Sequence, residues 1–116
     1  MTTNKPKMTN DDIDAMDLME TFKMTKVQRR TSAGGAWVKG TISGHRFDAL
    51  VFPEHAECPN YELDDSRISK LWVQRISDRA TVANFDRGWD VRPTTPVAGQ
   101  SVDLLAAGLA ETVYAE

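Results

Sequence analysis

The residue types best suited to chemistry gather in one short segment, His55-Ala56-Glu57-Cys58. Imidazole and thiolate bind zinc, but a structural zinc site takes four such ligands and the chain has no second pair at a similar spacing. Cys58 as a nucleophile would need surroundings that favour the thiolate, whereas its neighbours are acidic. We therefore predict no catalytic residues, no metal site and no cofactor.

The same segment belongs to a polar stretch, residues 53–67, that has two prolines, an excess of acids and no periodicity. Its carboxylates lack the spacing of a calcium-binding loop. A long loop in a compact domain is often functional or mobile. The candidate contacts for a basic partner are Glu54, Glu57, Asp64 and Asp65. The alternative is an acidic loop that is simply solvated.

Tryptophans and lysines alternate along two predicted strands. If Val38 and Leu71 face a core, the opposite sheet face carries Trp37, Lys39, Lys70, Trp72 and Gln74. Aromatic rings interleaved with lysines suit stacking against single-stranded nucleic acid. Two other interpretations are a second small core under an N-terminal helix, and a protein interface anchored by tryptophan and methionine.

The elements that position these side chains follow from periodicity. Residues 36–42 alternate as a strand, and Ser43-Gly44 is a hairpin signal. Residues 46–52 form the second strand, and because both of its faces are largely apolar we expect it to be central.

Two more strands are predicted further along. Residues 68–76 alternate with Ile68 on the same side as Trp72, and residues 79–85 return as the fourth strand. A corner follows at Asp86-Arg87-Gly88, where glycine adopts positive φ without strain.

A C-terminal helix is predicted at about 101–114, with Ser101 as its N-cap. Its apolar stripe consists of Val102, Leu105, Leu109 and Val113. Gly108 inside this helix suggests a close approach to a strand. Residues 92–100 are predicted to be a linker.

An N-terminal helix is predicted at about 10–24, after a polar, disordered segment of residues 1–9. Its apolar stripe is Ile13, Met16, Met19 and Phe22. Residues 25–31 are ambiguous, because they either end this helix or start a short edge strand.

These elements define the fold class α+β, a four-stranded antiparallel β-meander over about residues 36–91. The C-terminal helix packs on one face, and residues 10–116 form a single domain with the N-terminal helix. The apolar residues are numerous enough to build one core in a chain of 116 residues.

Charge is distributed in blocks rather than spread evenly. Residues 21–50, which include Arg29 and Arg30, carry +5 and residues 67–92 carry +3, whereas the rest of the chain is acidic and the total is −3. This pattern argues against a uniformly basic nucleic-acid binder. A single cysteine fits a reducing compartment, and no secretory signal or membrane span is evident, so we expect a cytoplasmic protein.

Three segments carry a resemblance: W-V-K-G-T-I-S-G-H-R-F-D-A at 37–49, I-S-K-L-W-V at 68–73, and F-D-R-G-W-D at 85–90. Together they resemble small uncharacterised proteins carried by phages and plasmids, over about residues 36–92. The resemblance implies a mobile-element accessory protein and supplies no activity or catalytic residue. Proteins of this kind often bind host machinery, including restriction or CRISPR effectors.

The resulting prediction is a non-enzymatic interaction module that binds and modulates or inhibits a host protein complex. Its contacts would come from the acidic loop 54–65, the basic residues of 23–30 or the face of Trp37 and Trp72. The alternative is a single-stranded nucleic-acid-binding protein that uses the tryptophan and lysine face. The sequence leaves the oligomeric state open.

Overall fold

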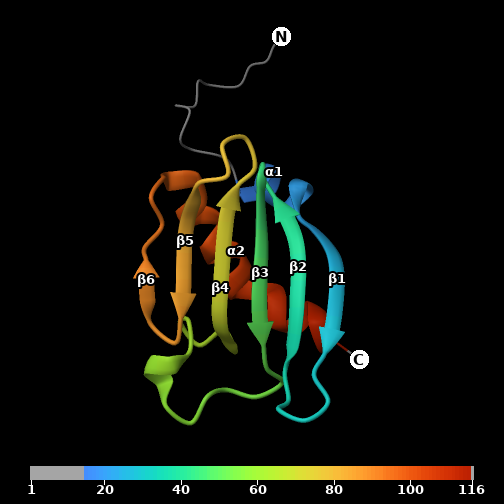
Figure 1. Cartoon of the computed structure of the whole chain (residues 1–116). Helices are drawn as coiled ribbons and strands as arrows, with labels where there is room; N and C mark the ends of the chain where they lie inside the picture. The colour runs from blue at the N-terminus through green and yellow to red at the C-terminus, as the bar shows by residue number, and fades with distance from the viewer. Residues whose placement is uncertain (1–14, 116) are drawn as a thin grey trace.

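The fold is α+β: one antiparallel sheet of six strands with a long helix across one face (Figure 1). A computed structural model describes residues 15–115, with side chains from Asp17 onward. Strands follow one another in the sheet in chain order. They are β1 (Lys23–Arg29), β2 (Ala36–Ile42), β3 (His45–Val51), β4 (Ile68–Arg75), β5 (Thr81–Asp86) and β6 (Trp89–Val91). The helices are α1 (Ala15–Thr21) and α2 (Pro96–Val113), with a short 3₁₀ turn at Pro59–Tyr61.

The prediction of four strands is wrong, because β1 and β6 add one strand at each edge. Every residue of β1 is exposed. Because neither side of this strand is buried, its sequence shows no clear alternation of apolar and polar residues. Its backbone nevertheless pairs with β2, from Lys23 opposite Thr41 to Arg29 opposite Ala36. Strand β6 is only three residues long and forms because the corner at Gly88 returns the chain beside β5. Both edge strands therefore form through backbone hydrogen bonds to a neighbouring strand, and the periodicity of their own residues does not reveal them.

The N-terminal helix ends earlier than predicted. Helix α1 stops at Thr21, and the Phe22 amide donates to the Met19 carbonyl as the chain turns. The helix prediction up to residue 24 is therefore wrong, since Lys23 begins a strand. The predicted first turn of this helix and the segment 1–9 lie outside the described residues.

The C-terminal helix begins five residues before its predicted start. Thr95 is the N-cap, and its hydroxyl accepts a hydrogen bond of 3.1 Å from the Ala98 amide. Pro96 occupies the first turn, where its fixed φ and missing N–H cost nothing. Ser101 is therefore not the cap; it is fully buried within the helix. The predicted linker 92–100 contains the helix start.

The core lies between the sheet and α2. The predicted stripe of Val102, Leu105, Leu109 and Val113 is buried, as are Val38 and Phe47 on the facing strands. Gly40 permits close packing here, because a Cβ at this position would meet the Lys23 carbonyl and the Phe47 ring. No such reason applies to Gly108, where an added Cβ meets nothing within 4 Å. The predicted close approach of Gly108 to a strand is wrong.

One residue changes sides through a β-bulge. Leu50 pairs with Lys70 but Val51 pairs with Ile68, so β4 contains an extra residue at this point. Ile68 is therefore fully buried in the core, with Leu71. Its predicted position on the side of Trp72 is wrong, because simple alternation ignores the bulge.

Helix α1 packs on the same side of the sheet as α2. Its Leu18 is 2% exposed and belongs to the same core as the α2 stripe. Within the described residues, no helix covers the opposite face of the sheet, which points toward the viewer in Figure 1. No helix in this part of the chain is long and apolar enough to cross a bilayer.

Candidate functional site

The open face of the sheet brings together five of the predicted contact residues. We use "open face" for the sheet surface opposite α2, which carries Trp37, Lys39, Lys70, Trp72 and Gln74. The register places Trp37, Leu50 and Lys70 in one row across β2, β3 and β4. Lys39, Asp48 and Trp72 form the next row. Two tryptophans two strands apart thus share one surface, each half-buried.

Cross-strand ion pairs partly neutralise Lys39 and Lys70 on the open face, whereas Lys26, which lies opposite Lys39, is exposed and has no such pair among the described residues. Lys39 Nζ lies 3.0 Å from Asp48 Oδ2, and Lys70 Nζ lies 3.7 Å from Asp86 Oδ1. These are opposite-charge neighbours of the kind that stabilise adjacent strands. The lysine charges are therefore partly compensated within the protein rather than free for a polyanion.

Hydrogen bonds hold two more polar side chains of the open face. Trp72 Nε1 donates to the Thr81 hydroxyl at 3.2 Å, and Gln74 Nε2 donates to the Arg79 carbonyl at 3.2 Å. The Trp72 ring is consequently fixed in position while it stays partly exposed. A fixed, half-buried aromatic ring loses little entropy on binding, which makes it a suitable anchor for a partner.

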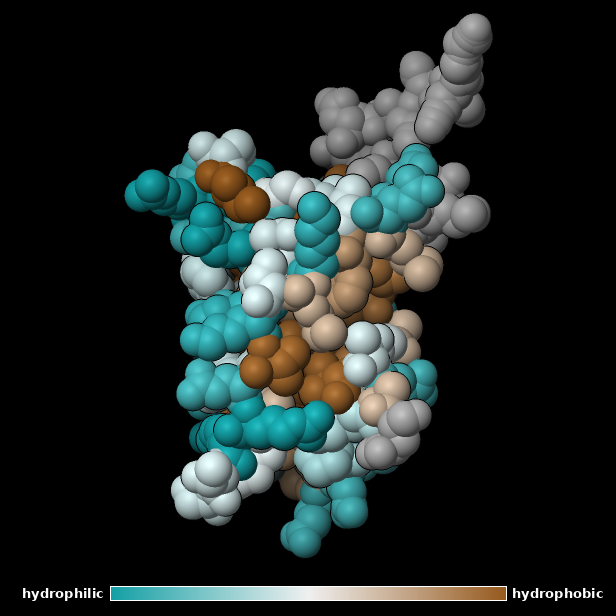
Figure 2. Space-filling model, turned by 90° about the vertical axis from the view of Figure 1, so that its right-hand side faces the viewer, coloured by the Kyte–Doolittle hydropathy of each residue, from teal (hydrophilic) through white to brown (hydrophobic). Residues whose placement is uncertain are grey.

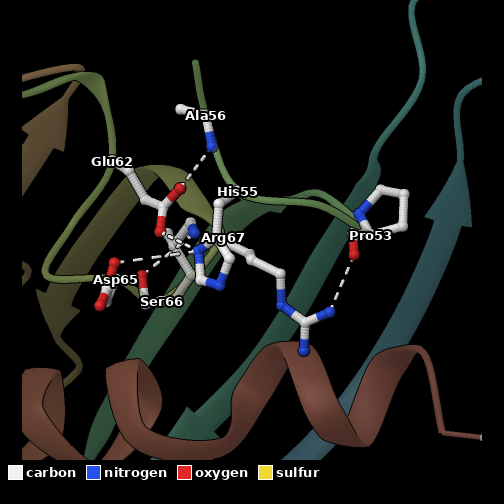
Figure 3. Close-up of polar contacts among 8 residues, drawn as sticks. Pro53, His55, Ala56, Glu62, Asp65, Ser66 and Arg67 are labelled. Atoms are coloured by element: carbon white, nitrogen blue, oxygen red, sulfur yellow. Dashed lines mark hydrogen bonds and ion pairs between the residues drawn. The ribbon is translucent and has the colours of Figure 1, made fainter. Parts of the chain in front are cut away.

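The acidic loop lies at one end of the sheet and is organised from within by a buried carboxylate. Glu62 Oε1 accepts from the Ala56 amide at 2.6 Å, and Glu62 Oε2 lies 2.7 Å from His55 Nδ1 (Figure 3). Burial raises the pKa of Glu62, but the hydrogen bonds from Ala56 and His55 outweigh it and leave the pKa below its ordinary value. Glu62 therefore closes the loop as a charged group.

The four predicted acidic contacts are exposed on this loop. They are Glu54, Glu57, Asp64 and Asp65. Asp64 and Asp65 both have positive φ, a conformation that acidic residues tolerate better than most. The loop places them at the end of the sheet, whereas the open face extends over its middle strands (Figure 1).

The potential metal ligands that lie close together in the structure differ from the His55–Cys58 segment of the sequence. His55, Glu62 and Asp65 offer ligand atoms that lie within 4.8 Å of one another, and Cys58 does not belong to this group. The sequence places Glu62 only among the acids of the loop. Because both Glu62 oxygens accept hydrogen bonds at short range, we interpret this cluster as a closure of the loop.

Arg29 and Arg30 have different surroundings. Arg29 Nη2 donates to the Val113 carbonyl at 3.3 Å and its guanidinium lies 5.0 Å from the centre of the Tyr114 ring. A cation at the C-terminus of α2 is favoured by the helix dipole. Arg30 lies away from this helix end, with its guanidinium 5.7 Å from the centre of the Phe52 ring.

An apolar groove between α1 and α2 is a second candidate surface, and the sequence does not predict it. It has a volume of about 300 Å³ and its lining includes Met19, Phe22, Leu104 and Leu109. Met19 is 59% exposed, and the neighbouring edge strand exposes Val27. The brown area at the centre of Figure 2 shows apolar side chains gathered on this side of the molecule. Side-chain spacing alone cannot show that two helices leave such a gap.

Fold and surface together define a small α+β protein with one covered and one open sheet face. The chain belongs to a family of proteins that share a domain of unknown function, DUF7678, whose model matches residues 36–110. The match begins at β2 and ends within α2, so α1 and β1 lie outside it. Neither the curated proteins nor the solved structures contain a match to this chain.

Proposed function

We propose that this protein is a non-enzymatic interaction module that binds a protein partner through the open face. The observation that carries the proposal is the pair of half-buried tryptophans, Trp37 and Trp72, on a sheet surface that no described helix covers. Tryptophan is among the residues enriched at the energetic anchors of protein interfaces. The two rings belong to strands held by β3 between them, so their spacing is preorganised.

The ion pairs beside the two tryptophans favour a protein over a nucleic acid as the partner. A phosphate backbone needs uncompensated cations, since release of counterions supplies most of the affinity. Lys39 and Lys70 instead face carboxylates on adjacent strands. A patchwork of paired charges around aromatic anchors matches the polar rim of a protein interface.

The resemblance to phage- and plasmid-borne proteins suggests the kind of partner. A mobile-element accessory protein of this size would bind a host complex, such as a restriction or CRISPR effector, and modulate or inhibit it. The exposed acids of the loop, including Glu54 and Asp65, would contact basic surfaces of such a complex.

The experiment compares partner capture by the wild-type protein and by a Trp37→Ala, Trp72→Ala double variant. We expect the double variant to recover at least about tenfold less of the partner from host lysate, because loss of two anchors removes several kcal/mol of binding free energy. The matched control is Ile76→Ala, which removes an exposed apolar side chain from the turn after β4. Thermal unfolding monitored by circular dichroism shows whether the variants fold. Equal recovery by a folded double variant would refute the use of this face.

A second candidate is single-stranded nucleic-acid binding, and one observation favours it. Arg46 is exposed on the open face and, within residues 15–115, has no carboxylate at ion-pair distance. This reading predicts that an oligonucleotide quenches the fluorescence of Trp37 and Trp72 and that the effect weakens steeply with salt. An unchanged spectrum at low salt would eliminate it.

A further inference from the structure

A pocket between the loop 53–67 and the ends of the central strands collects basic and aromatic side chains from distant parts of the chain. Its volume is about 480 Å³, within the range of small-molecule sites. The lining residues that matter here are Arg30, Phe52, Tyr61, Arg67, Lys70 and Arg87. They come from the segment after β1, the end of β3 with the loop that follows it, the start of β4 and the β5–β6 corner. Only the tertiary structure brings these segments together.

The cations of this pocket outnumber the carboxylates that could neutralise them. Neither Arg30 nor Arg67 has a carboxylate at ion-pair distance in the described part of the chain, and Lys70 and Arg87 share Asp86, at 3.7 and 3.9 Å. The Glu62 carboxylate is directed at Ala56 and His55, as Figure 3 shows. The other acid in the lining, Glu54, is exposed.

Arg67 is held in place by the loop itself. One of its guanidinium nitrogens, Nη1, donates to the Pro53 carbonyl at 2.9 Å, as Figure 3 shows. The Arg67 backbone has φ of 67°, in the left-handed region that is unfavourable for a side-chain-bearing residue. The fork of the guanidinium keeps further N–H groups available for an acceptor with several oxygens.

Two aromatic rings lie beside two of these cations. The Arg30 guanidinium is 5.7 Å from the centre of the Phe52 ring, and that of Arg87 is 5.8 Å from the centre of the Tyr61 ring. Tyr61 is 51% exposed, so its ring has surface left for stacking. Each ring therefore combines a flat apolar surface with an adjacent positive charge. A ligand that matches both features has a planar ring system and an anionic group.

We propose that this pocket binds a phosphate monoester carried by a planar base, as in a nucleoside monophosphate or the phosphorylated end of a nucleic-acid strand. Arg67 and Arg30, the two cations of the lining without a carboxylate at ion-pair distance among the described residues, contact the phosphate, and Tyr61 stacks on the base. The pocket is a binding site distinct from the tryptophans of the open face, which do not line it. It goes beyond the proposed partner binding and does not depend on it.

Isothermal titration calorimetry of the full-length protein tests the proposal with three probes: 5′-nucleoside monophosphates, the matching nucleosides, and inorganic phosphate. We expect the monophosphate to bind at least about tenfold more tightly than either fragment, since only it uses both the cations and the rings. No heat of binding with any monophosphate at millimolar concentration would overturn the proposal. Equal affinity for the nucleoside and the monophosphate would overturn it as well.

The variant Arg67→Gln removes one uncompensated cation and keeps a hydrogen-bond donor. We expect its affinity for the monophosphate to fall about tenfold, in line with the loss of a charge-assisted hydrogen bond. Arg79→Gln, in the exposed turn between β4 and β5 and outside the pocket, is the control with the same change in net charge, and its affinity should stay as in the wild type. Arg30→Gln is the second variant if Arg67→Gln fails to fold. Equal affinities of the pocket and control variants would contradict the assignment.

Oligonucleotides with a 5′-phosphate or a 5′-hydroxyl distinguish the two sources of this chemistry. Tighter binding of the phosphorylated oligonucleotide than of the mononucleotide identifies the strand end as the ligand, and the reverse order identifies the free nucleotide. Equal binding of the phosphorylated and hydroxyl oligonucleotides would exclude the strand end as the ligand, and equal binding of the mononucleotide and its nucleoside as well would overturn phosphate recognition. Partner capture by the tryptophan variants is measured separately, so failure of one proposal does not imply failure of the other.

Discussion

The two faces of the sheet are built from the same strands but have opposite properties. On the face that α2 covers, side chains such as Val38 and Phe47 are completely buried. On the open face, the next residues along the same strands, Trp37 and Asp48, are half-buried. Asp48 forms an ion pair with Lys39. Alternation of side chains along each strand separates a stabilising surface from a surface available for binding.

The comparison indicates where change is tolerated. Substitutions on the covered face remove packing and leave a cavity, so they act on folding. Substitutions on the open face leave the core intact and act on contacts with a partner. Substitutions in the loop 53–67 are of both kinds, because the loop is on the surface and yet contains the buried Glu62.

The largest expected effect is that of Phe47→Ala on the covered face. Phe47 is fully buried and stacks on Phe22, with 6.1 Å between the ring centres. We expect the free energy of unfolding to fall by about 3–5 kcal/mol, measured by urea denaturation. A loss below about 1 kcal/mol would show that the two faces do not differ in the way the packing implies.

The next effect concerns the loop, through Glu62→Ala. Loss of the carboxylate leaves the Ala56 amide without its partner, and we expect destabilisation by about 2 kcal/mol at pH 7. The folded pKa of Glu62 lies below its ordinary value of 4.5, so this stabilisation is present above that pH and is lost as the pH falls below it.

Urea denaturation at pH 7 and at pH 3 tests the Glu62 prediction. The difference between the wild type and Glu62→Ala should shrink at the lower pH. The control is Glu57→Ala, because Glu57 is exposed on the same loop. A difference that grows toward low pH would contradict the assigned role.

A smaller effect of opposite sign is expected for Gly108→Ala in α2. An added methyl group meets nothing within 4 Å, and alanine is a better helix former than glycine by about 1 kcal/mol. The variant should therefore unfold at a higher urea concentration. Destabilisation would contradict the free space beside Gly108. It would mean that this surface position is as tightly packed as the covered face of the sheet.

The smallest effect is expected for Lys39→Ala on the open face. The side chain of Lys39 is 53% exposed, so solvent screens its ion pair with Asp48. The free energy of unfolding should change by less than about 0.5 kcal/mol in the same assay. A loss comparable to that of Phe47→Ala would remove the distinction between the faces.

Some features of the binding surfaces could be predicted and others could not. The shared position of Trp37 and Trp72 follows from alternation in two strands, because it depends only on local backbone geometry. Neutralisation of Lys39 and Lys70 depends on the register with β3 and β5, which alternation does not specify. The pocket around Arg67 joins four segments that are far apart in the chain.

The sequence by itself determined which side chains of β2 point to the core, and also the buried stripe of α2. These features repeat with the period of a strand or a helix, so short-range geometry defines them. The tertiary structure decided the rest: the pairing that makes Lys23–Arg29 an edge strand, the bulge that buries Ile68, and the closure of the loop by Glu62. Each of these needs a partner that is distant in the chain or a break in regular geometry, and local pattern contains neither.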